Sequence, residues 1–566
     1  MRASGSPGER SPATGAGRRH LVPFLAIAGV WLATTILWLQ PGLLLPDGAG
    51  YLVYLPSAWL DRDLLFFDEW QELGMIAGGI IQHKDVTSTA HLGNHWTVGA
   101  ALAWFPAFIV ADALQPLLEF PRNGFSLPYN IGVIVTTAFA GLGTLLLGYA
   151  IARPVSGAGP AALAAIGTWF GTTLMWYSLA HATMAHAISA CSSALVFAAA
   201  IALRRRGEPA MVLLAGLAVG FAFAVRPQNA PLAAVPLIVA SVSRRHLPWY
   251  AGGMAAGALP QIVVSWFLYG SPLGFLTGGG SATPFAAFQR VWAWEPLLSW
   301  YHGLFTWTPF AAAGVAGLLL LLRHDRRLAV AGLVLFASQW IINATLERSF
   351  WGALSFGQRR FDSCIVVFLI GAAALLRALS PPWRAVVVAV PSAWTMALFL
   401  AARGSMLDLS RYVLPADLMA AQWSAVTSAG AALVPLGSTP APFQAKVALL
   451  IVLFVTVLAV AVAGLRRLPI RGAAALASSW FLGAALFLFW CGTRDASRID
   501  RYRDLIERNR IFATIPGGAD VRFGLLRDEL DYLRRSGRIE EAEATARELA
   551  VLERARAAAL REKGLP

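Results

Sequence analysis

Apolar segments of membrane-spanning length recur along the whole chain, and short arginine clusters separate them. The first segment, Leu21 to Leu39, is long enough for one helical crossing of a bilayer and too long for the core of a signal peptide. Of the 566 residues, 57% are hydrophobic and 13% are charged, whereas soluble proteins carry about a quarter charged residues. The sequence therefore predicts an all-α polytopic membrane protein.

The arginine clusters predict how the chain crosses the membrane. Because loops rich in Lys and Arg stay in the cytoplasm, placing every cluster there gives about thirteen crossings, a cytoplasmic N-terminus and an extracytoplasmic C-terminus. One further apolar segment, Trp96 to Leu114, would invert the charge pattern if it crossed, so we expect a re-entrant or shallow helix there. The predicted spans are 21–39, 128–150, 161–178, 186–203, 209–225, 230–243, 248–269, 304–322, 328–346, 362–378, 385–402, 446–464 and 473–491.

Polar ends flank the predicted membrane domain, which covers residues 20–492. Residues 1–19 are rich in Gly, Ser, Pro and Arg, a composition typical of a disordered tail, which would be cytoplasmic. Residues 493–566 are charged and carry apolar residues at three- and four-residue spacing, which predicts a small helical region outside the membrane. Its simplest arrangement is a helical hairpin packed on the external face.

The first external loop, residues 41–93, contains an acid directly after the first span. Asp47 stands in PDGAGY, and carboxylates at a membrane boundary usually face a cavity or pathway. The proline and glycines predict a turn of irregular backbone. The alternative is an interfacial aspartate that caps a short helix beginning near Ala49. Two alternating stretches, Tyr51 to Leu60 and Leu64 to Ile81, predict amphipathic helices lying in the membrane interface.

Ionisable and aromatic groups also stand at the external ends of other predicted spans. A histidine there either serves a site or anchors the span end by hydrogen bonds to backbone, and an arginine either binds a ligand or snorkels to the headgroups. Tryptophans fit an aromatic belt at the interface whether or not a site exists. The residues concerned are His181, His186, Arg226, His302 and Trp351.

Arg359 and Arg360 stand between two predicted spans on the external side, against the preference for arginine in the cytoplasm. Paired arginines in that place need an anionic partner, and the planar guanidinium group binds phosphate bidentately. The candidate partners are a lipid headgroup and a lipid-linked phosphate substrate.

Several classes of function are disfavoured. The net charge of +14 comes from clusters between spans, so nucleic-acid binding is not expected. The sequence lacks a GxxxxGK(S/T) loop, which disfavours an ATP-driven pump, and it lacks the HExxH zinc motif. A metal site made of His83, Asp85, His91 and His95 matches no standard spacing, so we expect no metal.

The order of motifs resembles that of a known family. An acid after the first span, interfacial helices, and the stretches LGNHWTVGAALAWFPAF, AVRPQN, YHGLFTWTP and FWGALSFGQRRF resemble bacterial integral-membrane glycosyltransferases of the GT-C superfamily. Within it, the chain looks like the protein O-mannosyltransferase-like and lipid A aminoarabinose transferase-like proteins. The resemblance covers residues 20–490 and implies a multi-pass protein of the bacterial cytoplasmic membrane.

The resemblance also implies a reaction. A sugar would pass, with inversion, from a polyprenyl-phosphate donor to an unknown glycan, lipid or protein acceptor on the external face, without a cofactor or metal. The acid of the family corresponds to Asp47, which would deprotonate the acceptor hydroxyl as general base. Arg359 and Arg360 would hold the departing phosphate. The further substrate-binding candidates are His186, Arg226, His302 and Trp351.

Two features depart from the family pattern. Many relatives carry two adjacent acids in the first loop, whereas Gly48 follows Asp47 here. Asp68 and Glu69 could supply the second carboxylate, so both are further binding candidates. The HPP-like stretch of the family corresponds loosely to NHW, which adds His95 to the candidates.

A transporter or flippase for a lipid-linked or anionic solute is one alternative, and a non-catalytic membrane scaffold is another. Transporters usually place ionisable groups near the bilayer midplane and contain related halves, whereas here these groups stand at span ends and no internal repeat is evident. A scaffold would tolerate substitution of Asp47 and Arg359. We therefore favour an enzyme.

Overall fold

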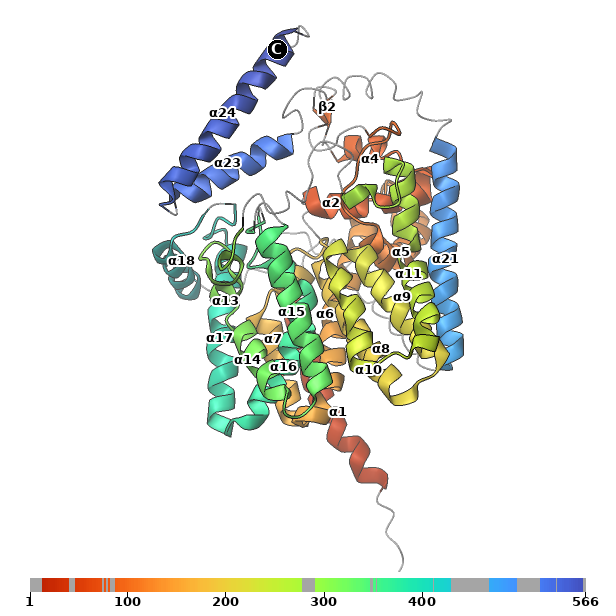
Figure 1. Cartoon of the computed structure of the whole chain (residues 1–566), viewed down its shortest axis with the longest axis vertical. Coiled ribbons are helices and arrows are strands. Elements are labelled where there is room, and N and C mark those ends of the chain that lie inside the picture. Colours follow the sequence, from red (N-terminus) through yellow and green to blue (C-terminus); the bar gives the residue numbers. More distant parts are fainter. Residues whose placement is uncertain are drawn as a thin grey trace, which may run out of the picture.

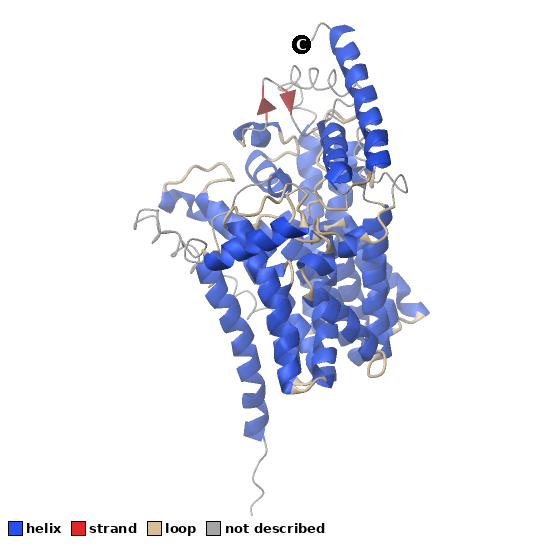
Figure 2. Ribbon diagram, turned by 90° about the vertical axis from the view of Figure 1, so that its left-hand side faces the viewer, coloured by secondary structure: helices blue, strands red, loops and turns tan. Residues whose placement is uncertain are grey.

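The computed structural model describes residues 13–39, 46–73, 76–77, 80–81, 87–276, 291–346, 350–352, 354–410, 412–428, 468–495, 520–535 and 537–562. These residues form a bundle of helices, with shorter helices and loops gathered at one end (Figure 1, Figure 2). The strands found in these ranges, β1 (Ile76–Ala77) and β2 (Ile80–Ile81), pair antiparallel in a two-stranded sheet. The predicted all-α polytopic fold is confirmed.

Eight helices in the described ranges are long and apolar enough to cross a membrane, judged by length and composition. Two of them, α8 and α11, end at Gly207 and Gly270, whose φ angles of 65° and 68° are left-handed and typical of helix ends. The eight are α5 (Gly99–Leu118), α6 (Leu127–Ser156), α8 (His186–Arg206), α11 (Leu247–Tyr269, with the turn from Arg244), α15 (Arg326–Thr345), α16 (Ile365–Ala378, with the turn from Arg359), α17 (Pro381–Arg403) and α21 (Ile470–Asp495).

Other helices accompany these eight, within the bundle or at the end where the shorter helices gather (Figure 1). Among them, α9 begins with a proline in its first turn, where the missing N–H costs nothing. Outside the first loop they are α1 (Ala13–Trp38), α7 (Ala158–Gly171), α9 (Pro209–Val225), α10 (Ala234–Ala240), α12 (Glu295–Leu298), α13 (Leu304–Trp307), α14 (Phe310–Leu321), α18 (Pro415–Thr427), α23 (Asp520–Arg535) and α24 (Ile539–Glu562).

Most predicted spans coincide with helices, and the exceptions have local causes. The predicted span 304–322 is divided at Pro309, between α13 and α14. The predicted span 230–243 opens with a 3-10 turn at Pro227–Ala233, and α10 follows with seven residues. Proline removes a backbone donor and disfavours the α conformation before it, so it interrupts both segments.

Of two further predicted spans, one is shorter in the structure and the other lies outside the described residues. The predicted span 161–178 is cut short because α7 ends at Gly171 and a π-helical turn at Trp176–Ala180 follows. The predicted span 446–464 lies outside the described residues. The total number of crossings therefore stays a prediction.

The segment expected to be re-entrant or shallow forms one continuous helix, α5. Its 20 residues correspond to roughly 30 Å, the length of a crossing. The buried indole of Trp104 donates to Thr137 Oγ1 of α6 at 2.9 Å, so α5 is integrated into the bundle. The segment is therefore one helix that is long and apolar enough to cross a membrane, and whether it does so stays a prediction.

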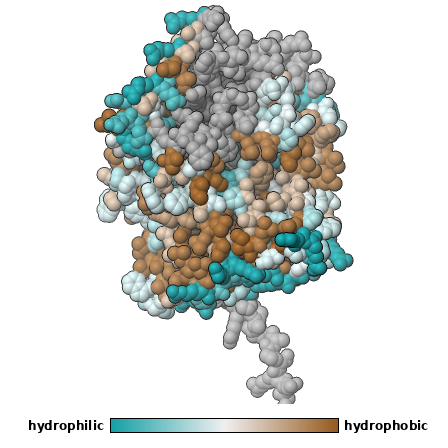
Figure 3. Space-filling model, viewed as in Figure 1, coloured by the Kyte–Doolittle hydropathy of each residue, from teal (hydrophilic) through white to brown (hydrophobic). Residues whose placement is uncertain are grey.

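The bundle has two distinct ends. At one end, Arg204 of α8 pairs with Asp325 in the loop before α15 at 2.8 Å, and the start of α1 lies there too (Figure 1). A hydrophilic rim runs along this end below a hydrophobic middle (Figure 3). The opposite end carries the first loop and the helices α23 and α24, and we call it the α2 end.

The first loop forms short helices at the α2 end, and their apolar side chains are buried in the protein. Tyr54 and Trp70 are each 1% exposed. Arg62 and Phe66 have positive φ angles, so the chain turns there, and the second predicted amphipathic helix is reduced to the six residues that follow Phe66. The elements are α2 (Pro46–Leu52), α3 (Tyr54–Pro56), a π-helical turn (Ser57–Asp61) and α4 (Phe67–Glu72).

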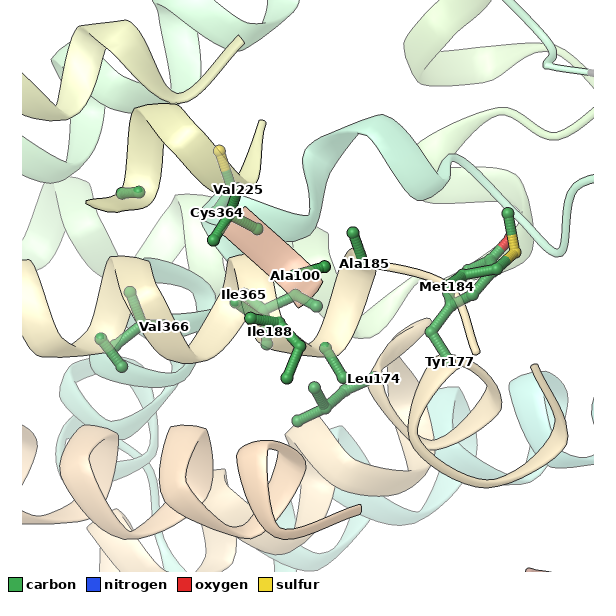
Figure 4. Packing of buried hydrophobic residues seen from close by; sticks show 14 of the residues in the cluster. Ala100, Leu174, Tyr177, Met184, Ala185, Ile188, Val225, Cys364, Ile365 and Val366 are labelled. Carbon is green, nitrogen blue, oxygen red and sulfur yellow. The ribbon is translucent and has the colours of Figure 1, made fainter. Parts of the chain in front are cut away.

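Small residues set the closest helix contacts. A Cβ on Gly216 of α9 would lie 2.3 Å from the carbonyl oxygen of Tyr250 in α11. A Cβ on Gly317 of α14 would lie 1.8 Å from the carbonyl oxygen of Gly371 in α16. The backbones therefore touch, as in many membrane helix pairs. Larger side chains that pack around α8 include Ala100, Ile188 and Ile365 (Figure 4).

Candidate functional site

An ion pair between two predicted site residues lies at the α2 end. Asp47 Oδ2 is 2.9 Å from Arg359 Nη1, and the two side chains are 33% and 13% exposed. Asp47 belongs to the first turn of α2, where a carboxylate is favoured by the helix dipole. The predicted irregular turn is therefore wrong, because the PDGAGY stretch is helical from Pro46.

The glycines of this stretch allow α2 to pack closely. A Cβ on Gly48 would lie 2.5 Å from Thr183 Oγ1, and a Cβ on Gly50 would lie 1.9 Å from the Trp96 ring. The second contact involves a rigid indole that cannot move aside easily. Gly50 thus fixes the distance between α2 and the segment around Trp96.

The NHW stretch holds α2 from the other side. Asn94 Nδ2 donates to the carbonyl oxygen of Gly50 at 2.8 Å, and the Tyr54 hydroxyl donates to the carbonyl oxygen of Trp96 at 2.7 Å. His95 itself is exposed and stacks on Trp96 with ring centroids 3.9 Å apart. The stretch loosely matched to the family motif therefore acts here mainly through Asn94 and Trp96, which support the helix of Asp47.

Arg359 opens a 3-10 turn, Arg359–Cys364, just before α16. Its Nη1 atom faces Asp47 and also lies 4.0 Å from Met184 Sδ. A Cβ on Gly352, whose φ angle is 61°, would lie 3.3 Å from Arg359 Nε and 3.6 Å from Nη2. Gly352 therefore packs against the Nε–Nη2 side of the guanidinium group, where a side chain would crowd it.

A second, more deeply buried network centres on Asp362, which is 1% exposed. Its Oδ2 atom accepts from His186 Nδ1 at 2.8 Å and lies 3.4 Å from Arg226 Nε, while Oδ1 accepts from Ser189 Oγ at 3.0 Å. Asn229 Nδ2 donates to Ser189 Oγ at 2.9 Å. A buried carboxylate with this many donors is compensated for its loss of water.

His186 lies between Asp362 and Arg226. Its Nδ1 atom is 2.8 Å from Asp362 Oδ2, and Arg226 Nη1 is 2.9 Å from His186 Nδ1 and 3.3 Å from His186 Nε2. Arg226 also donates from Nη2 to Gln228 Oε1 at 3.1 Å. His186 and Arg226, both predicted site residues, are therefore brought together by a carboxylate that the sequence analysis missed.

Asp362 had a signal in the sequence. It stands at the start of the predicted span 362–378, where an ionisable residue is costly and needs a partner. The preceding arginine pair predicted an anionic partner. Within the chain itself, Asp47 pairs with Arg359, and Asp362 pairs with Arg226.

Tyr51 is a buried phenol on the helix of Asp47. It lies one helical turn after Asp47 on the same face of α2 and is 7% exposed. Burial raises the pKa of Tyr51, while the positive charge of Arg226 lowers it and the negative charge of Asp47 raises it. The hydroxyl of Tyr51 therefore remains protonated.

The other two histidines are neutral and enclosed by aromatic rings. His181 lies 4.8 Å from the Trp176 ring, and burial followed by the charge of Arg359 lowers its pKa to about 4. His302 is fully buried, contacts the Trp307 ring at 4.7 Å, and its Nε2 is 3.3 Å from the carbonyl oxygen of Leu409. Burial lowers the pKa of His302 to about 3, so it supports the loop as an uncharged ring.

Arg360 and Trp351 complete the arginine-bearing segment. Arg360 is partly buried, and its carbonyl oxygen accepts from Gln228 Nε2 at 2.9 Å. Trp351 is 1% exposed and packs among other aromatic rings, so it does not belong to a lipid-facing aromatic belt. Trp351 therefore packs beside the segment that carries Arg359 and Arg360.

The two acids of α4 differ in environment. Asp68 is exposed, whereas Glu69 is 4% exposed and its Oε1 atom has no hydrogen-bond partner in the described part of the chain. Burial raises the pKa of Glu69 well above its usual range, and the negative charge of Asp61 raises it further. Glu69 is therefore a buried acid that keeps its proton, and the second carboxylate near the arginines is Asp362.

The histidine-rich stretch of the first loop joins the loop to α21. His91 Nε2 lies 2.8 Å from Asp495 Oδ2, and the Leu64 amide donates to Asp495 Oδ1 at 3.1 Å. His83 and Asp85 lie outside the described residues. Within the described ranges, no three or more His, Cys, Asp or Glu side chains are grouped so that they could hold a metal ion.

An apolar cavity of about 280 Å³ lies between the first loop, α5 and α21. Tyr54, the first residue of α3, is one of its lining residues. Aromatic and aliphatic side chains dominate its walls, as in sites for apolar ligands. The larger side chains that line it are Tyr54, Trp59, Phe105, Trp480, Phe487 and Leu488.

No family model matches the sequence, and no curated protein matches it. The chain is similar to two solved structures of ArnT from Cupriavidus metallidurans, one bound to undecaprenyl phosphate (17% identity, TM-score 0.42) and one in the apo state (16% identity, TM-score 0.44). Each comparison covers 87% of this chain and 80% of the ArnT chain. ArnT is a lipid A aminoarabinose transferase and a GT-C glycosyltransferase, the kind of protein that the sequence motifs resemble.

Proposed function

We propose that this chain is a GT-C-type glycosyltransferase that uses a polyprenyl-phosphate-linked sugar at the α2 end, on the external face of the bacterial cytoplasmic membrane. The observation that carries the proposal is the ion pair of Asp47 and Arg359 at 2.9 Å. It places a carboxylate that can take a proton beside a cation that can hold a phosphate.

In the proposed reaction, Asp47 takes the proton of the acceptor hydroxyl, and the acceptor oxygen forms a bond to the anomeric carbon. The bond from that carbon to the phosphate oxygen breaks with inversion, and the lipid phosphate keeps the electron pair. Arg359 would stabilise the growing charge of the phosphate through its guanidinium group. Nη1 can keep its contact with Asp47 meanwhile.

The charge of the site supports an anionic ligand. Arg226 faces Asp362 at 3.4 Å, and Arg359 faces Asp47 at 2.9 Å. The neighbouring His181 is neutral at pH 7 because burial lowers its pKa to about 4. Guanidinium groups gathered at a partly closed site attract phosphate.

The placement of the charges favours an enzyme over a transporter. His186 is the first residue of α8, Arg226 follows the end of α9, and Arg359 precedes α16. The groups therefore lie at helix ends, whereas transporters commonly bind solutes near the middle of the bilayer. The apolar cavity between the first loop, α5 and α21 offers a place for part of the isoprenoid chain.

The test compares two acids of the first loop. Protein in lipid nanodiscs is incubated with a pool of polyprenyl-phosphate-linked sugars and membrane acceptors, and transfer of radioactive sugar is measured. Asp47→Asn should abolish transfer while donor binding persists, because only the proton acceptor is removed. Glu72→Gln, the corresponding change at an exposed acid of α4, should leave transfer unchanged. Full transfer by Asp47→Asn would refute the base role.

A further inference from the structure

The C-terminal hairpin of α23 and α24 is joined to the α2 end by a hydrophobic cluster separate from the main core. Its aromatic members come from segments that precede α16, and its aliphatic members come from the hairpin. We call it the tail cluster, and its residues are Trp292, Tyr301, Phe350, Trp351, Leu526, Leu530, Leu533, Ala542 and Leu549.

A polar contact fixes the turn of the hairpin. Arg538 Nη1 lies 3.1 Å from Glu295 Oε1 of α12, and its guanidinium carbon lies 5.1 Å from the centre of the Trp292 ring. Arg538 also pairs with Glu541 at the start of α24 at 2.6 Å. The hairpin is therefore docked by packing, by a cation–π contact and by charge.

The tail cluster adjoins the segment of Arg359 directly. The carbonyl oxygen of Phe350, a cluster member, accepts from Gln358 Nε2 at 2.8 Å. Gly352, the residue after Trp351, lies against the Arg359 guanidinium group, since a Cβ there would be 3.3 Å from Nε. Two contacts thus lead from the docked hairpin to the arginine of the candidate site.

We propose that the C-terminal hairpin positions Arg359 for its anionic ligand, through the Phe350–Gly352 segment. The anionic ligand is the lipid phosphate, which rests on the proposed function. A segment that is already held in place loses less conformational entropy when the ligand binds, so docking raises the affinity. Trp351 then acts as a positioning residue.

The experiment releases the hairpin without touching the site. Leu533→Asp places a carboxylate in the tail cluster, where Leu533 is fully buried. Val551→Asp adds the same charge on α24 at a side chain that is 57% exposed, and it serves as the matched control. Undecaprenyl phosphate binding is measured in nanodiscs, and hydrogen–deuterium exchange is followed at the amides of Arg359 and Phe361, which are hydrogen-bonded to Gly357 and Gln358.

We expect Leu533→Asp to speed exchange at Arg359 and Phe361 and to weaken binding roughly fivefold or more, the lower range for coupled sites. Val551→Asp should match the wild-type chain in both measurements. Exchange on α9 and α11 reports whether the bundle remains folded, and Leu533→Ala replaces Leu533→Asp if it does not. The positioning role is refuted if hairpin amides lose protection while exchange at Arg359 or the affinity stays unchanged. If the wild-type chain binds no undecaprenyl phosphate, the proposed donor class fails and the exchange result alone decides the positioning role.

Discussion

The buried carboxylate Asp362 offers the sharpest test of the site's electrostatics. Asp362→Asn keeps the shape of the side chain, and its amide oxygen can still accept from Ser189 Oγ. It removes the negative charge that faces His186 at 2.8 Å and Arg226 at 3.4 Å. Removing one partner of a buried ion pair costs about 3–5 kcal/mol. Because Arg226 keeps 13% exposure and a bond to Gln228, we expect the lower end, about 3 kcal/mol.

The free energy of unfolding is measured by denaturant titration in mixed micelles, with tryptophan fluorescence as the signal. The control is Asp325→Asn, which breaks the pair with Arg204 at the opposite end, where the arginine is 32% exposed. A pair of this kind contributes about 1 kcal/mol or less. A double-mutant cycle adds Arg226→Gln, and the coupling with Asp362→Asn should be about 2 kcal/mol. Equal losses in the two Asp→Asn variants, or additive effects in the cycle, would show that the charges in the Asp362 network do not compensate each other.

Two further predictions concern close packing and pH. Gly50→Ala would drive a Cβ into the Trp96 ring, so it should destabilise the protein by about 1–3 kcal/mol and reduce transfer. Gly252→Ala, which has open space around it, should be tolerated in a thermal denaturation assay. Equal stability of the two variants would contradict the close packing of Gly50 against Trp96. Burial lowers the pKa of His302 from 6.5 to about 3, so the unfolded chain binds a proton that the folded protein refuses. Stability is then complete above pH 6.5 and falls as the pH drops toward 3, by up to about 1.4 kcal/mol per pH unit. His302→Gln should flatten this loss between pH 6 and 4, and an unchanged pH profile would argue against the burial of a neutral ring.

The sequence was sufficient to find the members of the central ion pair but not their relation. Asp47 interrupts an apolar run and Arg359 defies the charge rule, so each is visible from its own surroundings. That they lie 2.9 Å apart depends on the packing of α2 against elements hundreds of residues away. Local patterns carry no information about that distance.

The sequence also did not predict which polar and aromatic side chains are buried. His302 and Trp351 carry the same local signals as interfacial anchors, yet both are enclosed, one beside Trp307 and the other in the tail cluster. The turns between the short helices were equally hard to predict, because Arg62 and Phe66 adopt positive φ angles although neither residue is a glycine. Long apolar helices such as α9 were predicted at the correct boundaries because their composition alone determines them.

The contact between His91 and Asp495 has a consequence for the synthesis of the protein. The two residues are 404 positions apart in the chain. At a translation rate of about 5–20 residues per second, His91 leaves the ribosome roughly 20–80 s before its partner. During this time the first loop lacks its contact with Asp495. A ribosome that stalls before α21 would leave a nearly complete bundle whose first loop lacks its contacts with Asp495.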